Sequence, residues 1–224
     1  MATEETNKPQ AAATLPADEP VIKNEAKARK IIMWASVAVA LVVIATLVYV
    51  YCFRTPDIEK GNQAIGEADT ALIIAGNDST ALAQYELVAS KYGHAAGNRA
   101  NLNAAILLFQ KGEYDKALSY LKSYSPSESV IGAAAASLEG DCYVNLDKLA
   151  DAVKCFKKAI KLSDDNPAYT PFFMMKLATV LTAQGDYAAA ADLYQQINTK
   201  YPAYGPQTNI DIEKYLDYCR NMAK

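Results

Sequence analysis

One short phrase recurs at a nearly constant interval along most of this chain. The letters GEYDKA at residues 112–117 return as GDYAAA at residues 185–190, and weaker copies lie between and before them. Aligned on their last alanine, the four copies are 36, 35 and 38 residues apart, a period typical of stacked helix-turn-helix units. Most of the chain is therefore predicted to be an array of one unit. The aligned alanines are Ala81, Ala117, Ala152 and Ala190.

Each aligned alanine is followed four positions later by a large side chain. Residues four apart on a helix lie one above the other on the same face. We therefore expect the alanine and the large residue of each copy to share one buried face. The large residues are Tyr85, Leu121, Phe156 and Tyr194.

A turn precedes each of these helices. The residue just past a helix end commonly takes the left-handed conformation, which costs a residue with a Cβ about 1–2 kcal/mol. Glycine is favoured there for that reason, and Asp147 in the third copy is an allowed but poorer substitute. The turns of the other three copies carry Gly76, Gly112 and Gly185.

These features resemble the tetratricopeptide repeat, which couples a small residue in its first helix to a Gly-x-Tyr turn and a small-then-aromatic pair in its second. On that pattern the small residue is Ala105, Gly140 and Ala178 in copies two to four, whereas the first copy has Asp69. The resemblance implies an all-α fold, an α-solenoid of about four repeats whose stacking supplies the core.

The end of the array carries its own signals. Pro167 and Pro202 are expected to close the second helices of the third and fourth copies, because an interior proline removes a hydrogen bond. Beyond them, Thr208 is predicted to be the N-cap of a capping helix, with Asp211 three residues later. The apolar stripe expected to bury this helix contains Ile212, Tyr215, Leu216, Cys219 and Met222.

Upstream of the array, residues 31–53 run for 23 positions without a charge. A helix of that length is about 34 Å long, enough to cross a hydrocarbon core of about 30 Å. Its twelve Ile, Leu, Val or Phe residues favour insertion by about 4–7 kcal/mol. We predict an uncleaved transmembrane signal-anchor helix. A cleavable signal peptide is the alternative, disfavoured because the apolar run and the leader before it are both too long.

Basic residues crowd the N-terminal flank of this segment. Since basic flanks stay in the cytoplasm, the N-terminus is predicted to be cytoplasmic and the repeats to lie outside. In a bacterium with two membranes, the chain would be a single-pass inner-membrane protein with periplasmic repeats. The flanking residues are Lys23, Lys27, Arg29 and Lys30 on one side and Arg54 and Lys60 on the other.

The composition of residues 1–30, which are poor in aromatics, contain three prolines and balance five acids against five bases, predicts a disordered cytoplasmic tail. A short linker then joins the span to the array. The predicted division is a tail at 1–30, a transmembrane helix at 31–53, a linker at 54–61, repeats at 62–97, 98–132, 133–170 and 171–207, and a capping helix at 208–224.

The sequence offers little for catalysis. The only histidine is His94, so a histidine-based metal site is not expected, and phosphate-binding or Gly-x-Ser-x-Gly motifs are absent. A net charge of −3 argues against nucleic-acid binding. We therefore predict no enzymatic activity, no cofactor and no metal.

Two groups of side chains leave alternatives open. Cys142 and Cys155 lie on paired helices of the third copy, where buried free thiols are favoured over a bridge. A basic stripe on the second helix of the same copy is expected to be a solvated outer face, the alternative being a docking strip for an acidic partner. Its members are Lys154, Lys157, Lys158 and Lys161.

In tetratricopeptide arrays the first helices line a concave groove, and the resemblance places that groove on copies two to four. Its mixture of side chains suits an extended or helical peptide, although Ile106, Leu138 and Phe172 fit packing between repeats equally well. A lysine and asparagine clamp for a terminal carboxylate is not expected, because those positions hold other residues. The predicted partner-binding residues are Arg99, Asn103, Phe109, Asp141, Asn145, Phe172, Met175 and Lys176, with Ser137 and Thr179 at neighbouring groove positions.

The arrangement of tail, single span and short array is similar to the YfgM-like ancillary subunits of the Sec translocon. That similarity implies a non-enzymatic membrane-anchored adaptor linking the translocon to periplasmic chaperones for exported proteins, with a homo-oligomer allowed. One alternative is an envelope-organising scaffold similar to the Tol-Pal coordinator or to outer-membrane assembly proteins, which share closing phrases such as the Lys-Tyr-Pro at 200–202. A sensing subunit of a signalling system and a cytosol-facing organelle receptor also fit this arrangement.

Overall fold

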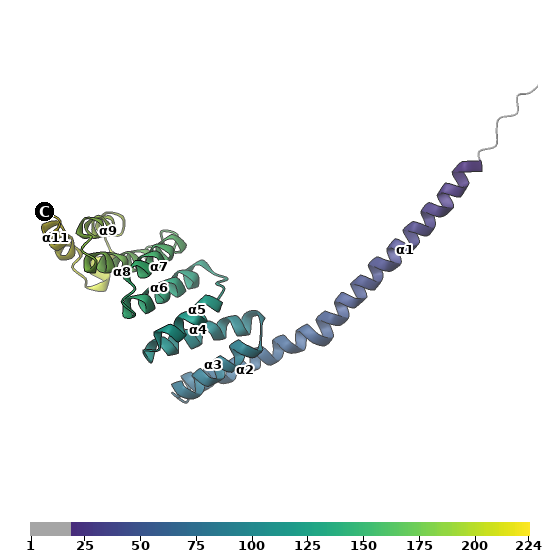
Figure 1. Ribbon diagram of the computed structural model, residues 1–224, viewed down its shortest axis with the longest axis horizontal. Helices are drawn as coiled ribbons and strands as arrows, with labels where there is room; N and C mark the ends of the chain where they lie inside the picture. Colours follow the sequence, from purple (N-terminus) through teal and green to yellow (C-terminus); the bar gives the residue numbers. More distant parts are fainter. Residues whose placement is uncertain (1–18) are drawn as a thin grey trace, which may run out of the picture. The chain divides into compact units, whose positions relative to one another are not determined.

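The computed structural model describes the backbone of residues 19–224 and the side chains from residue 25 onward. The described residues form two compact units, which divide between Thr55 and Pro56. Regular structure within the described residues is helical throughout, which confirms the all-α prediction (Figure 1). In chain order the elements are α1 (Glu19–Tyr49), the π-helix η1 (Val50–Arg54), α2 (Thr55–Ile73), α3 (Asp78–Lys91), α4 (His94–Gln110), α5 (Tyr114–Ser123), α6 (Ser129–Asn145), α7 (Leu149–Leu162), α8 (Thr170–Ala183), α9 (Tyr187–Lys200), α10 (Tyr204–Thr208) and α11 (Ile212–Met222).

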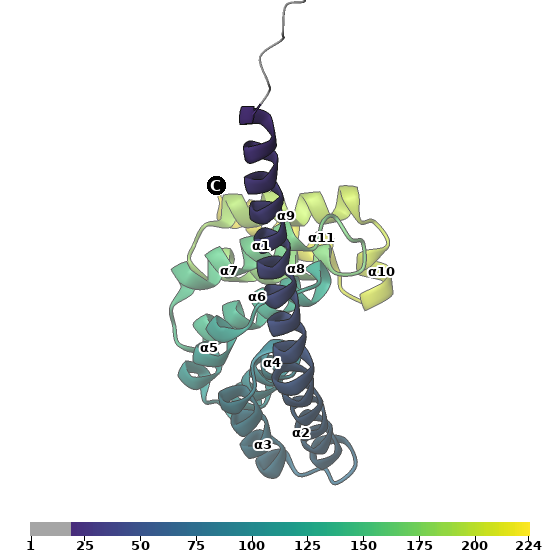
Figure 2. The same cartoon turned by 90° about the vertical axis from the view of Figure 1, so that its right-hand side faces the viewer.

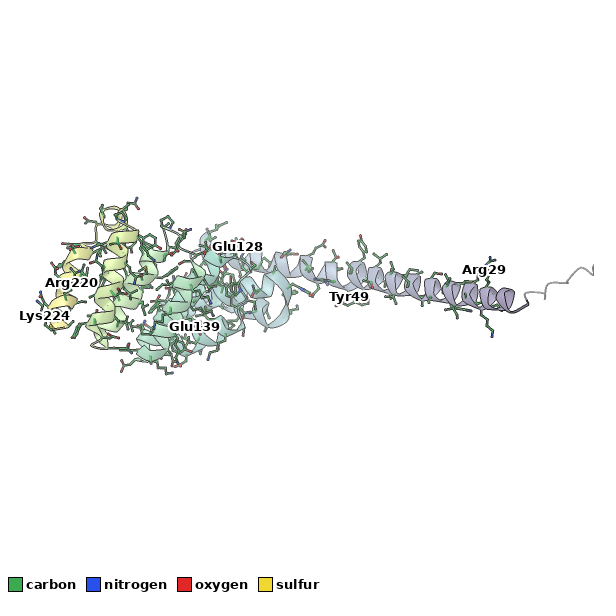
Figure 3. The ribbon with its side chains drawn as sticks, turned by 90° about the horizontal axis from the view of Figure 1, so that it is seen from above. Arg29, Tyr49, Glu128, Glu139, Arg220 and Lys224 are labelled. Atoms are coloured by element: carbon green, nitrogen blue, oxygen red, sulfur yellow. The ribbon has the colours of Figure 1, made fainter. Side chains whose placement is uncertain are left out.

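The first unit contains the apolar segment predicted to cross a membrane. Its helix is long and apolar enough for that purpose. All side chains from residue 25 to residue 49 are exposed. Figure 3 shows these side chains projecting from the helix, with Arg29 and Tyr49 labelled.

Two segments that were expected to be irregular are helical. Of the predicted tail, residues 1–18 lie outside the described residues, but residues 19–30 belong to α1. Pro20 is compatible with this helix because it lies in the first turn, where no backbone N–H is needed. The predicted linker at 54–61 is also helical, and Thr55 Oγ1 donates a 2.9 Å hydrogen bond to the Val50 carbonyl ahead of Pro56.

The second unit is the array of paired helices. Four pairs follow one another, α2 with α3, α4 with α5, α6 with α7 and α8 with α9, and α11 packs on α9 at the end (Figure 1 and Figure 2). The first helices of repeats two to four begin at His94, Ser129 and Thr170, whereas the repeat starts predicted from the sequence are 98, 133 and 171. The short loops before α4 and α6 let those two helices begin about one turn earlier.

The expected pairing of alanine and large residue is confirmed in every repeat. The four aligned alanines have no exposed surface, and the large residues four positions later are at most 7% exposed. Each second helix therefore buries its small and large residues on one face, as the i and i+4 spacing requires.

Small residues in the first helices allow the two helices of a repeat to pack closely, as the repeat pattern implies. Ala105 and Ala178 are fully buried. A Cβ on Gly140 would lie 2.7 Å from Cε1 of Phe156, so only glycine fits there. Asp69, the exception in the first repeat, is half-buried and accepts a 2.7 Å hydrogen bond from the Tyr85 hydroxyl.

The turns also follow the sequence prediction. Gly76, Gly112, Asp147 and Gly185 all have φ between 56° and 81°, which is the left-handed region. Pro202 lies two residues after the end of α9. By contrast, α7 already ends at Leu162, five residues before Pro167, so that proline does not terminate it. The left-handed residues Asp164 and Asp165 turn the chain instead.

The capping helix begins later than predicted. Thr208 is not its N-cap, because this residue ends α10 and its hydroxyl donates to the Tyr204 carbonyl. Asp211 is the N-cap of α11, and its carboxylate accepts a 3.1 Å hydrogen bond from the Lys214 backbone N–H. Of the predicted stripe, Ile212, Leu216 and Cys219 are buried, whereas Tyr215 and Met222 are about half exposed.

Candidate functional site

The predicted partner-binding residues lie on consecutive first helices of the array. On α4 the groove positions 99, 103, 106 and 109 recur at intervals of three or four residues, which places them along one side of the helix. The same spacing relates 138, 141 and 145 on α6 and 172, 175 and 179 on α8, where Lys176 lies next to Met175. We call this surface the first-helix face. It comprises Asp69, Arg99, Asn103, Ile106, Phe109, Leu138, Asp141, Asn145, Phe172, Met175, Lys176 and Thr179.

A polar network joins the first two repeats on this face. The Arg99 guanidinium forms an ion pair with one oxygen of Asp69, and the Tyr85 hydroxyl donates to the other. Burial, followed by the hydrogen bond to Asp69, raises the pKa of Tyr85 to about 12. Tyr85 therefore remains a neutral donor at physiological pH, and the Asp69 carboxylate has both oxygens engaged.

This network borders a pocket of about 390 Å³ between α2, α3 and α4. Its walls combine apolar side chains with amides, including Asn103 and Gln110. Ile106 contributes an exposed apolar surface, with 38% of its area accessible. The apolar part of the lining is Leu72, Ile73, Ile106 and Leu107.

A second ion pair joins the third and fourth repeats. Lys176 on α8 donates to Asp141 on α6 at 2.5 Å, and both side chains are about a quarter exposed. The Lys176 ammonium also lies 4.9 Å from the ring centroid of Phe172 and 5.8 Å from that of Phe156. Burial raises the pKa of the Asp141 carboxyl above its ordinary value, outweighing the opposite effect of Lys176.

The other predicted residues differ in how accessible they are. Phe172 is 43% exposed. Asn145 is exposed, and its amide donates to the Asp141 carbonyl. Met175 and Phe109 are half-buried, and Phe109 packs against Tyr114 with ring centroids 5.5 Å apart. Ser137 is 3% exposed and does not contribute to the surface, because its helix position points toward the packed interior of the repeats.

Sequence reasoning did not identify two parts of this region. Asp69 was noted only as a departure from the repeat pattern, yet it neutralises the predicted groove residue Arg99. A pocket of about 740 Å³ also lies between the turn before α4 and the loop before α6, with Tyr92 and Tyr124 in its lining. Loop residues fall outside the repeat period, so no sequence signal indicated this pocket.

Groups that could support catalysis are sparse in the described part of the chain. No cluster of three or more His, Cys, Asp or Glu side chains suited to a metal ion occurs among those residues. The four cysteines are free thiols. Burial raises the pKa of Cys142 and of Cys155 to about 12, which leaves both as unreactive thiols at neutral pH.

The basic stripe lies on α7. All four of its lysines are exposed, and Lys154 pairs with Asp151 of the same helix at 2.9 Å. This helix is the second of its repeat, so the stripe is separate from the first-helix face.

Sequence comparison identifies the fold family. The profile of the Tetratricopeptide repeat-like domain matches residues 67–180, about half of the chain. The chain belongs to this family. A second tetratricopeptide repeat profile matches residues 173–204, which places a tetratricopeptide unit on α8 and α9. No curated protein matches the sequence.

Solved structures of tetratricopeptide proteins named MamA share this architecture. A crystal structure of MamA protein aligns with a TM-score of 0.59 at 17% identity, covering 74% of this chain and 83% of that one. MamA from Desulfovibrio magneticus RS-1 aligns with a TM-score of 0.53 at 17% identity, covering 64% and 77%. MamA AMB-1 aligns with a TM-score of 0.54 at 18% identity, covering 76% and 84%. At these identities the likeness concerns the fold alone. Tetratricopeptide domains typically bind proteins without enzymatic chemistry, and this fold supports such a role here.

Proposed function

We propose that this chain is a non-enzymatic adaptor that is anchored in the bacterial inner membrane and holds polypeptides on its periplasmic first-helix face. The observation that carries the proposal is a surface with exposed apolar side chains, Ile106 and Phe172, set among amides and two internal ion pairs. Such a surface fits an extended chain better than a small polar ligand.

The apolar helix of the first unit supports a membrane anchor. The side chains of residues 31–49 are exposed and mostly apolar, and lipid would remove that surface from water. The excess of basic residues before the span favours a cytoplasmic N-terminus and repeats outside the cytoplasm.

The proposed partners follow from this placement. A tethered array outside the inner membrane meets polypeptides as they leave the protein-conducting channel in an unfolded state. We propose that the chain links the Sec translocon to periplasmic chaperones and receives or passes on exported proteins. The similarity of its arrangement to the YfgM-like translocon subunits supports this proposal.

Site-specific photo-crosslinking in intact cells tests the proposal. A photoreactive residue at Asn103 or Phe172 is expected to capture exported polypeptides, translocon subunits or a chaperone. The control position is Lys157 on α7, which is exposed but lies off the first-helix face. Capture of Tol-Pal or outer-membrane assembly subunits would favour the scaffold alternative, and equal capture from Lys157 would contradict the proposed face.

A further inference from the structure

We infer that the first-helix face selects segments that are apolar and uncharged, rather than acidic or basic ones. This inference rests on the proposed function and names its substrate class. The face contains four charged residues, two acidic and two basic. They form two ion pairs, Arg99 with Asp69 and Lys176 with Asp141.

Both pairs join the first helices of consecutive repeats, α2 to α4 and α6 to α8. Each cation of the face therefore already has a protein carboxylate as its partner. Lys176 is further covered by the rings of Phe172 and Phe156, which lie 4.9 and 5.8 Å from its ammonium. An acidic ligand would have to share each cation with that carboxylate, which reduces the gain from pairing with it.

An acidic or a basic segment would also meet a like charge at each pair. A ligand aspartate near Arg99 would approach Asp69, and a ligand lysine near Asp69 would approach Arg99. Such contacts repel and require desolvation of a charge, which disfavours wrong partners. Internal pairing therefore works against ligand charges of both signs.

The remaining side chains of the face favour apolar and amide groups. The 390 Å³ pocket beside the first pair has four aliphatic side chains in its lining. Asn103 and Gln110 at the same pocket can pair with the backbone of an extended segment. Phe172 offers an exposed ring near the second pair. This chemistry matches the buried segments of a protein that has not yet folded.

The test uses the full-length protein in lipid nanodiscs and three synthetic peptides of equal length. One is rich in Leu, Phe and Asn, and the other two carry Asp or Lys at alternate positions. We expect the uncharged peptide to bind tightest, with a Kd that changes less than about twofold between about 50 and about 500 mM NaCl. If a charged peptide binds tightest and its Kd depends steeply on salt, the inference is overturned, but the proposed binding of polypeptides stands. Failure of all three peptides to bind would overturn the proposed function as well.

Releasing one charge provides a second test. Asp141→Asn frees Lys176 and is expected to tighten binding of the acidic peptide about tenfold at low salt. Lys176→Gln frees Asp141 and should favour the basic peptide instead. The control is Asp151→Asn, which frees Lys154 from an exposed pair within α7, away from the first-helix face. Circular dichroism melts verify that each variant is folded. Identical peptide selectivity in wild type, Asp141→Asn and Lys176→Gln would overturn the inference.

Discussion

The ring of Phe156 packs directly on the Cα of Gly140. A Cβ at that position would lie 2.7 Å from Cε1, 2.9 Å from Cζ and 3.0 Å from Cδ1 of the ring. Phe156 is 1% exposed and belongs to the buried core, so the ring cannot swing out into solvent without losing that packing. The contact joins the first and second helices of the third repeat, α6 and α7.

Replacing this glycine is therefore expected to destabilise the array. Gly140→Ala should lower the free energy of unfolding by about 1–3 kcal/mol, because the added methyl overpacks the interface. Gly66→Ala is the control, since Gly66 is exposed on α2 with no atom within 4 Å of the added Cβ. This control should gain up to about 1 kcal/mol from helix propensity. Urea unfolding measures both, and equal effects would contradict the packing argument.

Substitutions at two left-handed turn residues should change the free energy of unfolding in opposite directions. Asp147 has φ 56° and Gly185 has φ 81°. Asp147→Gly is expected to raise the free energy of unfolding by about 0.5–1 kcal/mol, whereas Gly185→Ala should lower it by about 1 kcal/mol. Gly93→Ala, at φ −80° with open space around it, should change little. A destabilised Asp147→Gly variant would show that its side chain, and not its backbone, matters.

Much of the fold could be predicted because it depends on short-range rules. The spacing from Ala152 to Phe156 and the glycine at 185 are local signals, and both predict the observed structure. The helical state of residues 54–61 was missed because Pro56 does not indicate whether a helix ends or begins. Here it lies in the first turn of α2, where proline is tolerated. The later start of α11 was missed because Thr208 belongs to the short helix α10 and Asp211 is the N-cap, and both residue types are common N-caps.

The ion pair of the third and fourth repeats leads to a pH-dependent prediction. Burial raises the pKa of Asp141 in the folded state, so its ionised form costs stability above that pKa, and this cost disappears as the pH falls through it. Lys176→Met raises the pKa further and should lower stability at pH 7 by about 1–3 kcal/mol. Part of the loss should be recovered as the pH falls toward about 4, the ordinary value for aspartate.

Asp141→Asn serves as the control for that variant. Asp141→Asn should lower the stability at pH 7 by less than Lys176→Met does, because the flexible Lys176 side chain can extend into solvent. Urea unfolding between about pH 4 and pH 8 distinguishes the two substitutions. If the loss of stability in Lys176→Met does not vary with pH, the cost of burying the ionised Asp141 carboxylate is not its cause.

The candidate face was predictable only in part. Positions such as Asn103 and Phe172 follow from the period of the first helices; Asn103 borders a pocket and Phe172 is 43% exposed. The pairing of Arg99 with Asp69 depends on the level at which two helices cross, which a spacing of 30 residues does not specify. Ser137 was expected at a groove position but is buried, because it lies on the side of α6 that faces the packed interior of the repeats.

The proposed anchor predicts a clear effect of charge within residues 31–53. Val42→Arg combined with Val43→Arg should cost about 5–7 kcal/mol of insertion energy, which offsets the whole gain expected from the segment. The protein should then become extractable from membranes with alkaline carbonate. Ile73→Arg, at an exposed apolar position on α2, is the control and should remain membrane-bound. Retention of the double variant would contradict a transmembrane role for this segment.

Polypeptide binding by the intact protein is the decisive measurement. The full-length chain in nanodiscs is titrated with a fluorescently labelled, uncharged apolar peptide, and wild type is compared with Ile106→Ala/Phe172→Ala. Loss of two apolar contacts should weaken binding about tenfold or more. Ile74→Ala/Leu87→Ala truncates two exposed apolar residues off the first-helix face and should bind like wild type. Equal weakening by both double variants, or no measurable binding by the wild-type protein, would contradict the proposal that the first-helix face holds polypeptides.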